Sequence, residues 1–150
     1  MCSSDLASHQ YYGAIAGGSG AGRGFGGTAA VQTHMTNSRL TDPEILETRF
    51  PVRLEEFSIR RGSGGAGMWR GGDGAVRRLR FLEPMRAGIL ANRRRVPPFG
   101  LAGGSDGAAG ANCVERVDGT VVRFGATASV AVDAGDTFVL LTPAGAGYGA

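Results

Sequence analysis

Lysine is absent from this chain of 150 residues, and all 16 of its permanently basic side chains are arginine. The chain therefore cannot supply the amine of a Schiff base or a pyridoxal site, nor the lysine of a phosphate-binding P-loop. A GC-rich genome explains the bias towards arginine, and a weakly basic surface patch is the alternative. The net charge of +3 is too small and too mixed to indicate a nucleic-acid partner.

Cysteine is also scarce, and long apolar runs are missing. Cys2 and Cys113 form no CxxC motif, so the sequence predicts neither a zinc site nor a disulfide scaffold, and no metal ligand is assigned. Sparse cysteine is compatible with a reducing cytoplasm, which is the predicted location. No apolar run approaches the ~20 residues of a membrane-spanning helix, and no signal peptide is evident, so no membrane partner is expected.

Glycine, by contrast, supplies 27 of the 150 residues, without a collagen-like period. Its clusters lie between short β-like runs, for example in residues 11–27 and 62–74. We interpret them as tight-turn positions rather than disordered linker, because glycine readily adopts the positive φ angles of such turns. The length fits a single domain.

The remaining pattern predicts a mainly β fold (α+β at most): a glycine-rich antiparallel or mixed β domain with one short helix. The helix begins near Thr41, which can cap it, has Pro43 in its first turn and ends before Pro51. Residues 28–36 stay undecided between strand and helix. Strands are predicted at residues 11–16, 52–59, 75–82, 86–92, 113–117, 120–124, 128–132 and 137–141.

Local signals refine two of these strand pairs. Asp118-Gly119 is typical of a hairpin turn, and a slip in the alternation at Glu55-Glu56 indicates a β-bulge. In residues 75–82, alternation predicts an apolar face and an opposite face of three arginines. The apolar face comprises Val76, Leu79 and Phe81, and the basic face comprises Arg77, Arg78 and Arg80.

The first ten residues differ in style from the rest. Met1–Leu6 reads like a translated sequencing adapter, so we expect residues 1–10 to be a non-native or disordered leader. Residues 11–150 are then the C-terminal part of a larger domain, whose gene continues upstream. Genomic sequence upstream of codon 7 tests this, because a native promoter and start there would contradict it.

His34 and Asp73 are the predicted catalytic residues. Imidazole is the side chain best suited to proton transfer near neutral pH, and His34 is the only histidine beyond residue 10. Asp73 follows a Trp-Arg-Gly-Gly run and offers an active-site carboxylate. The alternatives are structural, since a lone histidine is often structural and a carboxylate in a glycine-bounded turn often bonds its own backbone.

Five further residues are predicted to bind substrate. Thr36, Asn37 and Arg39 flank His34 and could hold an oxyanion or a ring carbonyl. Arg93 and Arg94 belong to a run of three arginines, whose forked guanidinium groups bind carboxylate or phosphate. A solvated charge run or a contact between domains is the alternative for this pair.

The segment Gly22-x-Gly24-x-x-Gly27 has the spacing of a dinucleotide-binding loop. Its upstream strand is short and its downstream helix is doubtful, so we interpret it as a plain turn. A backbone nest that cradles an anion is the alternative. Cys113 begins an apolar strand with no base nearby and is interpreted as a small buried hydrophobe.

Several ordered motifs, taken together, resemble the C-terminal portion of the hydantoinase B / 5-oxoprolinase family, most closely its 5-oxoprolinase branch. The resemblance covers residues 11–149. Its motifs are YYGAIAGGSGAGRGFGG, HMTNSRLTDPEILETRFPV, GSGGAGMWRGGDGAVR, ILANRRRVPPFGLAGG and TPAGAGYG.

This resemblance implies part of an ATP-dependent cyclic-amide hydrolase that opens 5-oxo-L-proline to L-glutamate, a step of glutathione metabolism. ATP is then bound by a partner domain or subunit of hydantoinase A type, which phosphorylates the lactam, and this B-type domain helps hydrolyse the activated ring. The fragment alone is expected to be inactive, and a homo- or hetero-oligomer is expected. The resemblance carries over no metal ligand.

One departure from the family pattern falls at the end of the chain, where TPAGAGYG replaces the usual TPGGGGYG. If those glycines need positive φ, Ala144 and Ala146 cost more than ~1 kcal/mol each. Two other functions stay open: a fragment of an acetone carboxylase-type subunit, and a non-catalytic domain whose glycine loops mediate assembly.

Overall fold

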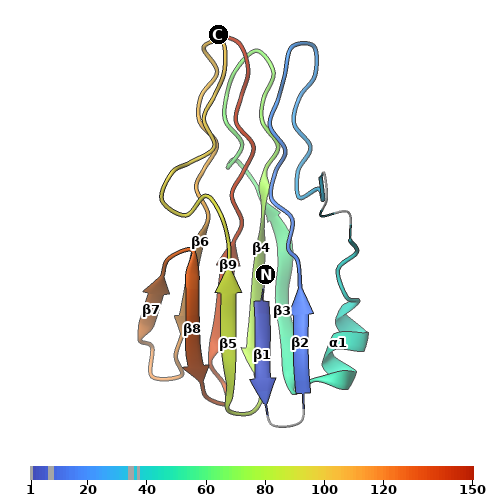
Figure 1. The fold of residues 1–150 in the computed structure, drawn as a ribbon, viewed down its shortest axis with the longest axis vertical. Helices are drawn as coiled ribbons and strands as arrows, with labels where there is room; N and C mark the ends of the chain where they lie inside the picture. The colour runs from blue at the N-terminus through green and yellow to red at the C-terminus, as the bar shows by residue number, and fades with distance from the viewer. Residues whose placement is uncertain (1, 7–8, 34–35, 37) are drawn as a thin grey trace.

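The computed structural model describes residues 2–6, 9–33, 36 and 38–150, with side chains from residue 10 onward. Two antiparallel sheets form a sandwich in the lower half of Figure 1, and extended glycine-rich segments rise above it. One short helix, α1 (Pro43–Arg49), lies beside the sandwich. The mainly β fold class predicted from the sequence is confirmed.

The first sheet has the strand order β2-β1-β5-β8 and the second has β3-β4-β9-β6-β7. Residues 133–136 link β8 to β9 and so carry the chain from one sheet to the other. The first sheet comprises β1 (Cys2–Leu6), β2 (His9–Gly13), β5 (Met85–Leu90) and β8 (Thr127–Val132). The second comprises β3 (Val52–Arg60), β4 (Gly74–Phe81), β6 (Ala111–Glu115), β7 (Val121–Phe124) and β9 (Thr137–Leu141).

The core lies between the two sheets. Phe81, Val114 and Phe138 of the second sheet form one buried cluster with Ile89 and Val132 of the first. Burial of large apolar side chains like these is the main favourable term in folding, at about 25 cal/mol per Å² of apolar surface. The sandwich is therefore held together by side chains.

Helix α1 closes one side of this core through Leu46, which is fully buried. Its N-cap is Asp42, whose Oδ1 accepts a hydrogen bond from the Glu44 amide at 3.0 Å. The predicted cap, Thr41, was wrong by one residue, because a carboxylate beside Pro43 reaches the free amides of the first turn. The helix ends at Arg49, and its C-cap Phe50 has extended geometry before Pro51, as predicted.

Strand β3 has its bulge between Leu54 and Glu56, and residues 116–120 form the predicted hairpin turn with Gly119 at φ 86°. The predicted faces of β4 were partly wrong. Arg77, rather than Val76, shares the buried face with Phe81, so an arginine lies inside the sandwich. Strict alternation from Phe81 gives this result, because side chains of a strand change face at every residue.

Strand β1 at residues 2–6 pairs with both β2 and β5. The structure therefore gives the predicted leader a place in the first sheet. The origin of this segment outside the native gene stays a prediction. Residues 28–33 and 36, which the sequence left undecided, form neither a β-strand nor an α-helix. Within the described residues, no helix is long and apolar enough to cross a membrane.

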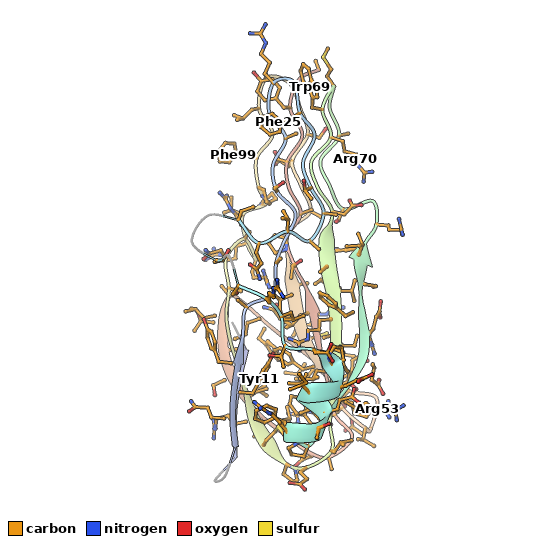
Figure 2. The ribbon with its side chains drawn as sticks, turned by 90° about the vertical axis from the view of Figure 1, so that its right-hand side faces the viewer. Tyr11, Phe25, Arg53, Trp69, Arg70 and Phe99 are labelled. Atoms are coloured by element: carbon orange, nitrogen blue, oxygen red, sulfur yellow. The ribbon has the colours of Figure 1, made fainter. Side chains whose placement is uncertain are left out.

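We call the extended segments above the sandwich the glycine-rich arm, comprising residues 17–31, 62–73, 98–108 and 143–149. Backbone hydrogen bonds join the segments, although they form no strand ladder. The last segment lies at the centre, with Gly65 N donating to Gly145 O and Gly147 N donating to Ser105 O, each at 2.9 Å. Figure 2 shows Phe25, Trp69 and Phe99 in the arm, far from Tyr11 in the sandwich.

The interpretation of these glycines as turn residues was wrong for most of the arm. A Cβ on Gly145 would overlap the carbonyl oxygen of Ser19, and one on Gly147 would overlap that of Ala66. Neither glycine has a positive φ. Glycine is needed there because two backbones approach more closely than a side chain allows.

The two alanines of this segment are compatible with the arm. Ala144 and Ala146 alternate with the two close-packed glycines and are 1% and 8% exposed. Neither has a positive φ. The condition for strain at these two positions is therefore not met, and the departure from the family pattern falls where a methyl group fits.

Candidate functional site

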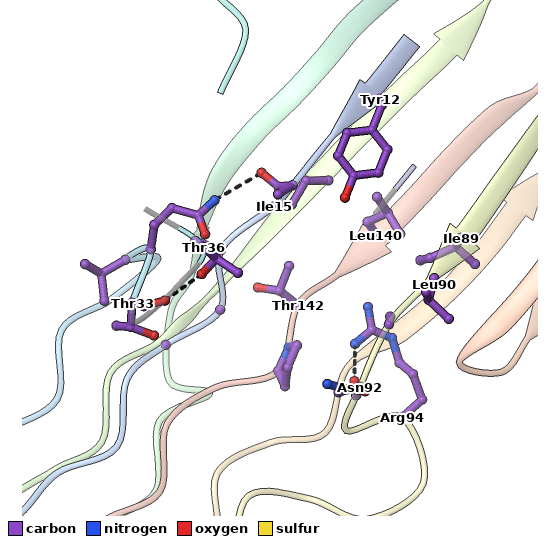
Figure 3. Close-up of a pocket in the computed structure, with 18 residues that line it drawn as sticks. Tyr12, Ile15, Thr33, Thr36, Ile89, Leu90, Asn92, Arg94, Leu140 and Thr142 are labelled. Carbon is purple, nitrogen blue, oxygen red and sulfur yellow. Dashed lines mark hydrogen bonds between the residues drawn. The ribbon is translucent and has the colours of Figure 1, made fainter. Parts of the chain in front are cut away.

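A cavity of about 510 Å³ lies where the sandwich meets the base of the arm (Figure 3). This volume is within the range of small-molecule sites. Strands β2, β5 and β9 supply its apolar wall, and residues 31–33 and 36 supply hydroxyl and amide groups. It is lined by Tyr12, Ala14, Ile15, Ala16, Gly17, Gly18, Val31, Gln32, Thr33, Thr36, Ile89, Leu90, Ala91, Asn92, Arg94, Leu140, Thr142 and Pro143.

Two of the five predicted substrate-binding residues line this cavity, Thr36 and Arg94. Thr36 Oγ1 donates to the Thr33 carbonyl at 2.7 Å. Arg94 is half-buried and extends from its loop towards Thr142 and Leu140 (Figure 3). The structure thus brings together residues that are far apart in the sequence.

Arg94 is held by neutral partners. Its Nε donates to Asn112 Oδ1 at 2.9 Å and its Nη1 donates to the Asn92 carbonyl at 2.8 Å. Burial and the positive charge of Arg60 lower the pKa of Arg94, so its cation is less stable here than in water. A guanidinium held this way is well suited to receive an anion.

Asn112 is a residue that the sequence reasoning missed. It is buried, accepts from Arg94, and donates through Nδ2 to the Gly125 carbonyl at 2.9 Å. A polar residue in the inward register of an apolar strand was the available signal, since buried amides require partners. Thr142 was missed as well: its Oγ1 accepts from the Ala75 amide at 2.6 Å.

Arg93 lies apart from Arg94, at a second cavity of about 370 Å³ along the arm. Its backbone adopts φ 55°. Its guanidinium lies 5.7 Å from the ring centroid of Phe99. Arg93 and Arg94, both predicted to bind substrate, therefore line different cavities.

Asp73 lines neither cavity. Its Oδ1 accepts from the Gly64 amide at 2.7 Å and from Arg70 at 3.0 Å, and its Oδ2 accepts from the Gly62 amide at 3.3 Å. The hydrogen bond from the Gly64 backbone N–H is the largest cause of the lowered pKa of Asp73, and it keeps the carboxylate charged. These partners give Asp73 a structural task, to fold residues 62–64 against the start of β4.

The remaining predicted residues of this segment are placed as follows. Arg39 is exposed and lines neither cavity. His34 and Asn37 lie outside the described residues. The roles predicted for all seven site residues stay predictions.

The spacing Gly22-x-Gly24-x-x-Gly27 does not build a phosphate loop. Gly22 and Phe25 exchange backbone hydrogen bonds of 3.1 Å, which makes this segment a hairpin tip. Residues 28–33, which come directly after it, form no helix. The plain-turn interpretation is therefore confirmed, and the part of the chain that the structure describes shows no fit to a nucleotide phosphate at this loop.

Metal and thiol chemistry find no support at this site. No group of three His, Cys, Asp or Glu residues in the described part of the chain is placed to hold a metal ion. Cys113 is half-buried, and burial followed by the charge of Glu115 raises the pKa of its thiol. A protonated thiol of this kind is a poor nucleophile.

Comparison with known proteins decides the family. The Hydantoinase B/oxoprolinase model matches residues 3–150. The chain belongs to this family. It is 46% identical over 139 residues to a 5-oxoprolinase of Dictyostelium discoideum and 48% identical over 139 residues to 5-oxoprolinase 1 of Arabidopsis thaliana. Each alignment covers 93% of this chain and 11% of the relative, so the chain spans about a tenth of the length of these relatives.

Two solved structures share the fold. An ATP-dependent caprolactamase of Pseudomonas jessenii superposes on 99% of this chain, and on 28% of its own, with a TM-score of 0.82 at 22% identity. A nucleotide-free acetone carboxylase superposes on 89% of this chain, and on 22% of its own, with a TM-score of 0.73 at 20% identity. The fold of the sandwich and arm therefore recurs as one part of both of these larger chains.

Proposed function

We propose that this chain is the C-terminal part of the B-type domain of an ATP-dependent cyclic-amide hydrolase that opens 5-oxo-L-proline to L-glutamate. The observation that carries the proposal is the 46–48% identity to 5-oxoprolinases over 93% of the chain. Identity to a putative D-/L-hydantoinase component from a Pseudomonas strain is lower, at 30% over 88% of the chain. The graded identity favours 5-oxoproline over a hydantoin as the ring.

In this proposal the chain supplies no nucleotide site of its own. A hydantoinase A-type domain or subunit binds ATP and transfers its terminal phosphoryl group to the lactam oxygen. Water then attacks the activated carbonyl carbon and the ring C–N bond breaks, which leaves the acyl phosphate of glutamate. A second water hydrolyses this acyl phosphate, so the final products are glutamate, ADP and phosphate. We further propose a cytoplasmic enzyme that works as a homo- or hetero-oligomer.

The cavity at the base of the arm is the proposed place where this chain contacts the substrate ring. Arg94 supplies a hydrogen-bond donor there and the Thr36 hydroxyl oxygen an acceptor, while Ile15, Ile89 and Leu140 exclude water from one side. His34 and Asn37 keep their proposed roles in proton transfer and carbonyl binding. Asp73, Arg39 and Arg93 lie outside the cavity, and any catalytic part for them requires contacts with the rest of the enzyme.

The test is ATP turnover by the full-length protein that contains this chain. We expect ADP release stimulated by 5-oxoproline, with one glutamate formed per ADP, and loss of both in His34→Ala while the fold stays intact. Stimulation by hydantoin or acetone instead would overturn the choice of substrate. No stimulation by any of the three would favour the assembly domain.

A matched pair of variants tests the cavity within the same assay. Arg94→Gln should raise KM for 5-oxoproline at least tenfold, because it removes a charged donor from the cavity wall. Arg95→Gln changes the exposed neighbour in the same run and should leave KM within twofold. Equal effects of the two substitutions would remove the cavity from the proposal.

A further inference from the structure

Five arginines are at least partly buried in the described part of the chain, and they divide into two groups. Arg78 pairs with Glu115 and Arg116 pairs with Asp136, each within salt-bridge distance. The other three have no carboxylate within 4 Å among the described residues: Arg60, Arg77 and Arg94.

Among these side chains, Arg77 is the one whose burial destabilises the folded state most. It is only 2% exposed, and its Nε and Nη2 have no hydrogen-bond partner. A guanidinium stays charged in proteins, and a buried charge without a partner strongly destabilises the folded state. Each unsatisfied buried group of this kind requires an explanation, and an absent anion is one.

The strand register places Arg77 next to Leu140, which lines the cavity, although Arg77 is not itself a lining residue. Arg77 of β4 pairs with Leu140 of β9, and Leu140 pairs with Asn112 of β6. Residues paired across antiparallel strands point to the same face, so these three side chains form one row on the buried face. Neighbouring strands are about 4.8 Å apart, which puts the row within roughly 10 Å.

Arg94 extends this row, because its Nε donates a hydrogen bond to Asn112 Oδ1. The two cationic side chains, Arg77 and Arg94, therefore flank Leu140, and Leu140 lines the 510 Å³ cavity. Arg60 adds a third positive charge nearby, since its Nη1 donates to the carbonyls of Ala109 and Thr142 at 2.8 and 3.3 Å. Three positive charges thus lie around Leu140, and among the described residues no carboxylate is within 4 Å of any of the three.

We propose that this cavity binds a small anionic group, a carboxylate or a phosphate, at Arg94, with the buried positive charge of Arg77 behind Leu140 adding to the attraction. Both anions match the forked donors of a guanidinium. The identity of the ligand rests on the proposed function, because 5-oxoproline carries one carboxylate and its activated form carries a phosphate as well. The anion site itself stands on burial, register and charge.

The test measures anion binding by the full-length protein, without ATP. Inorganic phosphate and 5-oxoproline are added separately, with chloride at the same ionic strength as the control, and the Tm is recorded. A ligand that binds only the folded state raises the Tm in a saturable way. We expect this rise for at least one of the two probes and none for chloride; the probe that produces it distinguishes phosphate from carboxylate.

Arg77→Met separates the proposal from a structural role. The Kd for the anion, obtained from the Tm shift, should rise at least tenfold in this variant. The Tm of the unliganded protein should rise as well, because the substitution removes an unpaired buried charge. Arg78→Met is the matched control on the same strand. Since Arg78 is bonded to Glu115 on the opposite face, its loss should leave Kd within twofold.

If Arg77→Met does not fold, the same test is made with Arg94→Gln, which changes the half-buried arginine of the cavity. Arg95→Gln is the control for this variant. The proposal is overturned if neither probe raises the Tm of the wild-type protein. It is also overturned if Arg77→Met lowers the Tm with anion binding unchanged, which would indicate a carboxylate partner from elsewhere in the protein. Turnover of 5-oxoproline is assayed in parallel, so anion binding without turnover would contradict the proposed function alone.

Discussion

The sandwich and the glycine-rich arm hold their chains in place by opposite means, although one stretch of backbone runs through both. Strand β9 packs Phe138 and Leu140 into the core between the sheets. A few residues later the same chain enters the arm, where Gly145 and Gly147 pack backbone against backbone. Side-chain volume fills the first region, and the absence of side chains permits the second.

The difference shows how two sequence patterns specify order. In the sandwich, large apolar residues exclude water, and their loss leaves a cavity. In the arm, neighbouring segments approach until carbonyl oxygens occupy the space of a Cβ, so any added side chain overlaps an atom that cannot move away. Substitutions of opposite kinds should therefore break the two regions.

The largest expected effect is the loss of a core ring. Phe138 is 1% exposed and stacks on Phe124 with ring centroids 5.6 Å apart. Phe138→Ala should lower the free energy of unfolding by about 4 kcal/mol, measured by urea denaturation. Phe57→Ala removes a ring that is 50% exposed and should cost about 1 kcal/mol or less. Equal costs would contradict the described core.

The next effect belongs to the arm. Gly145→Ala adds one methyl group against the Ser19 carbonyl and should cost about 3 kcal/mol of unfolding free energy. Its neighbour gives the matched control, because Ala146→Gly removes a methyl that fits and should change stability by no more than about 1 kcal/mol. Should Gly145→Ala be neutral, the close approach of these segments is wrong.

A smaller effect is expected at the corner between the two sheets. The carboxylate of Asp136 accepts from Arg116 at 2.6 Å and from the amides of Asp133 and Val117 at 2.9 and 3.2 Å. Asp136→Asn should cost about 2 kcal/mol in urea denaturation, since hydrogen bonds to a charged group are lost. An unchanged midpoint would show that this corner does not depend on the charge.

The corresponding carboxylate of the arm, Asp73, is more exposed, and Asp73→Asn should cost about 1 kcal/mol. The Gly64 amide lowers the pKa of Asp73 below its ordinary value of 3.8. Its stabilising contribution is therefore present above pH 3.8 and is lost as the pH falls through the lowered pKa. The gap in stability between wild type and variant should shrink as the pH is taken below 3.8; a constant gap would contradict this.

Much of the sandwich could be predicted from the sequence. The bulge near Glu55-Glu56 and the Asp118-Gly119 hairpin follow from local alternation and turn chemistry, and the structure has both. The inward face of β4 could not be predicted in the same way. Arg77 shares the buried face, and a simple hydrophobic pattern assigns any arginine to solvent.

The arm shows the limit of the sequence more clearly. A glycine in a turn and a glycine packed against another backbone cannot be told apart in the sequence. Only contacts between distant segments distinguish Gly119 from Gly145. The residues around the candidate cavity are equally hard to predict from the sequence. Thr36 and Arg94 were named from local motifs, whereas Asn112 joins them only because β6 lies beside β9.

Amide hydrogen exchange on the full-length protein tests the central comparison most directly. If backbone packing orders the arm, the amides of Gly65, Gly145 and Gly147 should be protected as strongly as those of Val139 and Leu140 in β9, since all five are hydrogen bonded. Exchange of the three glycine amides at the rate of an unstructured peptide, with β9 still protected, would show that the arm is a flexible linker and contradict the account.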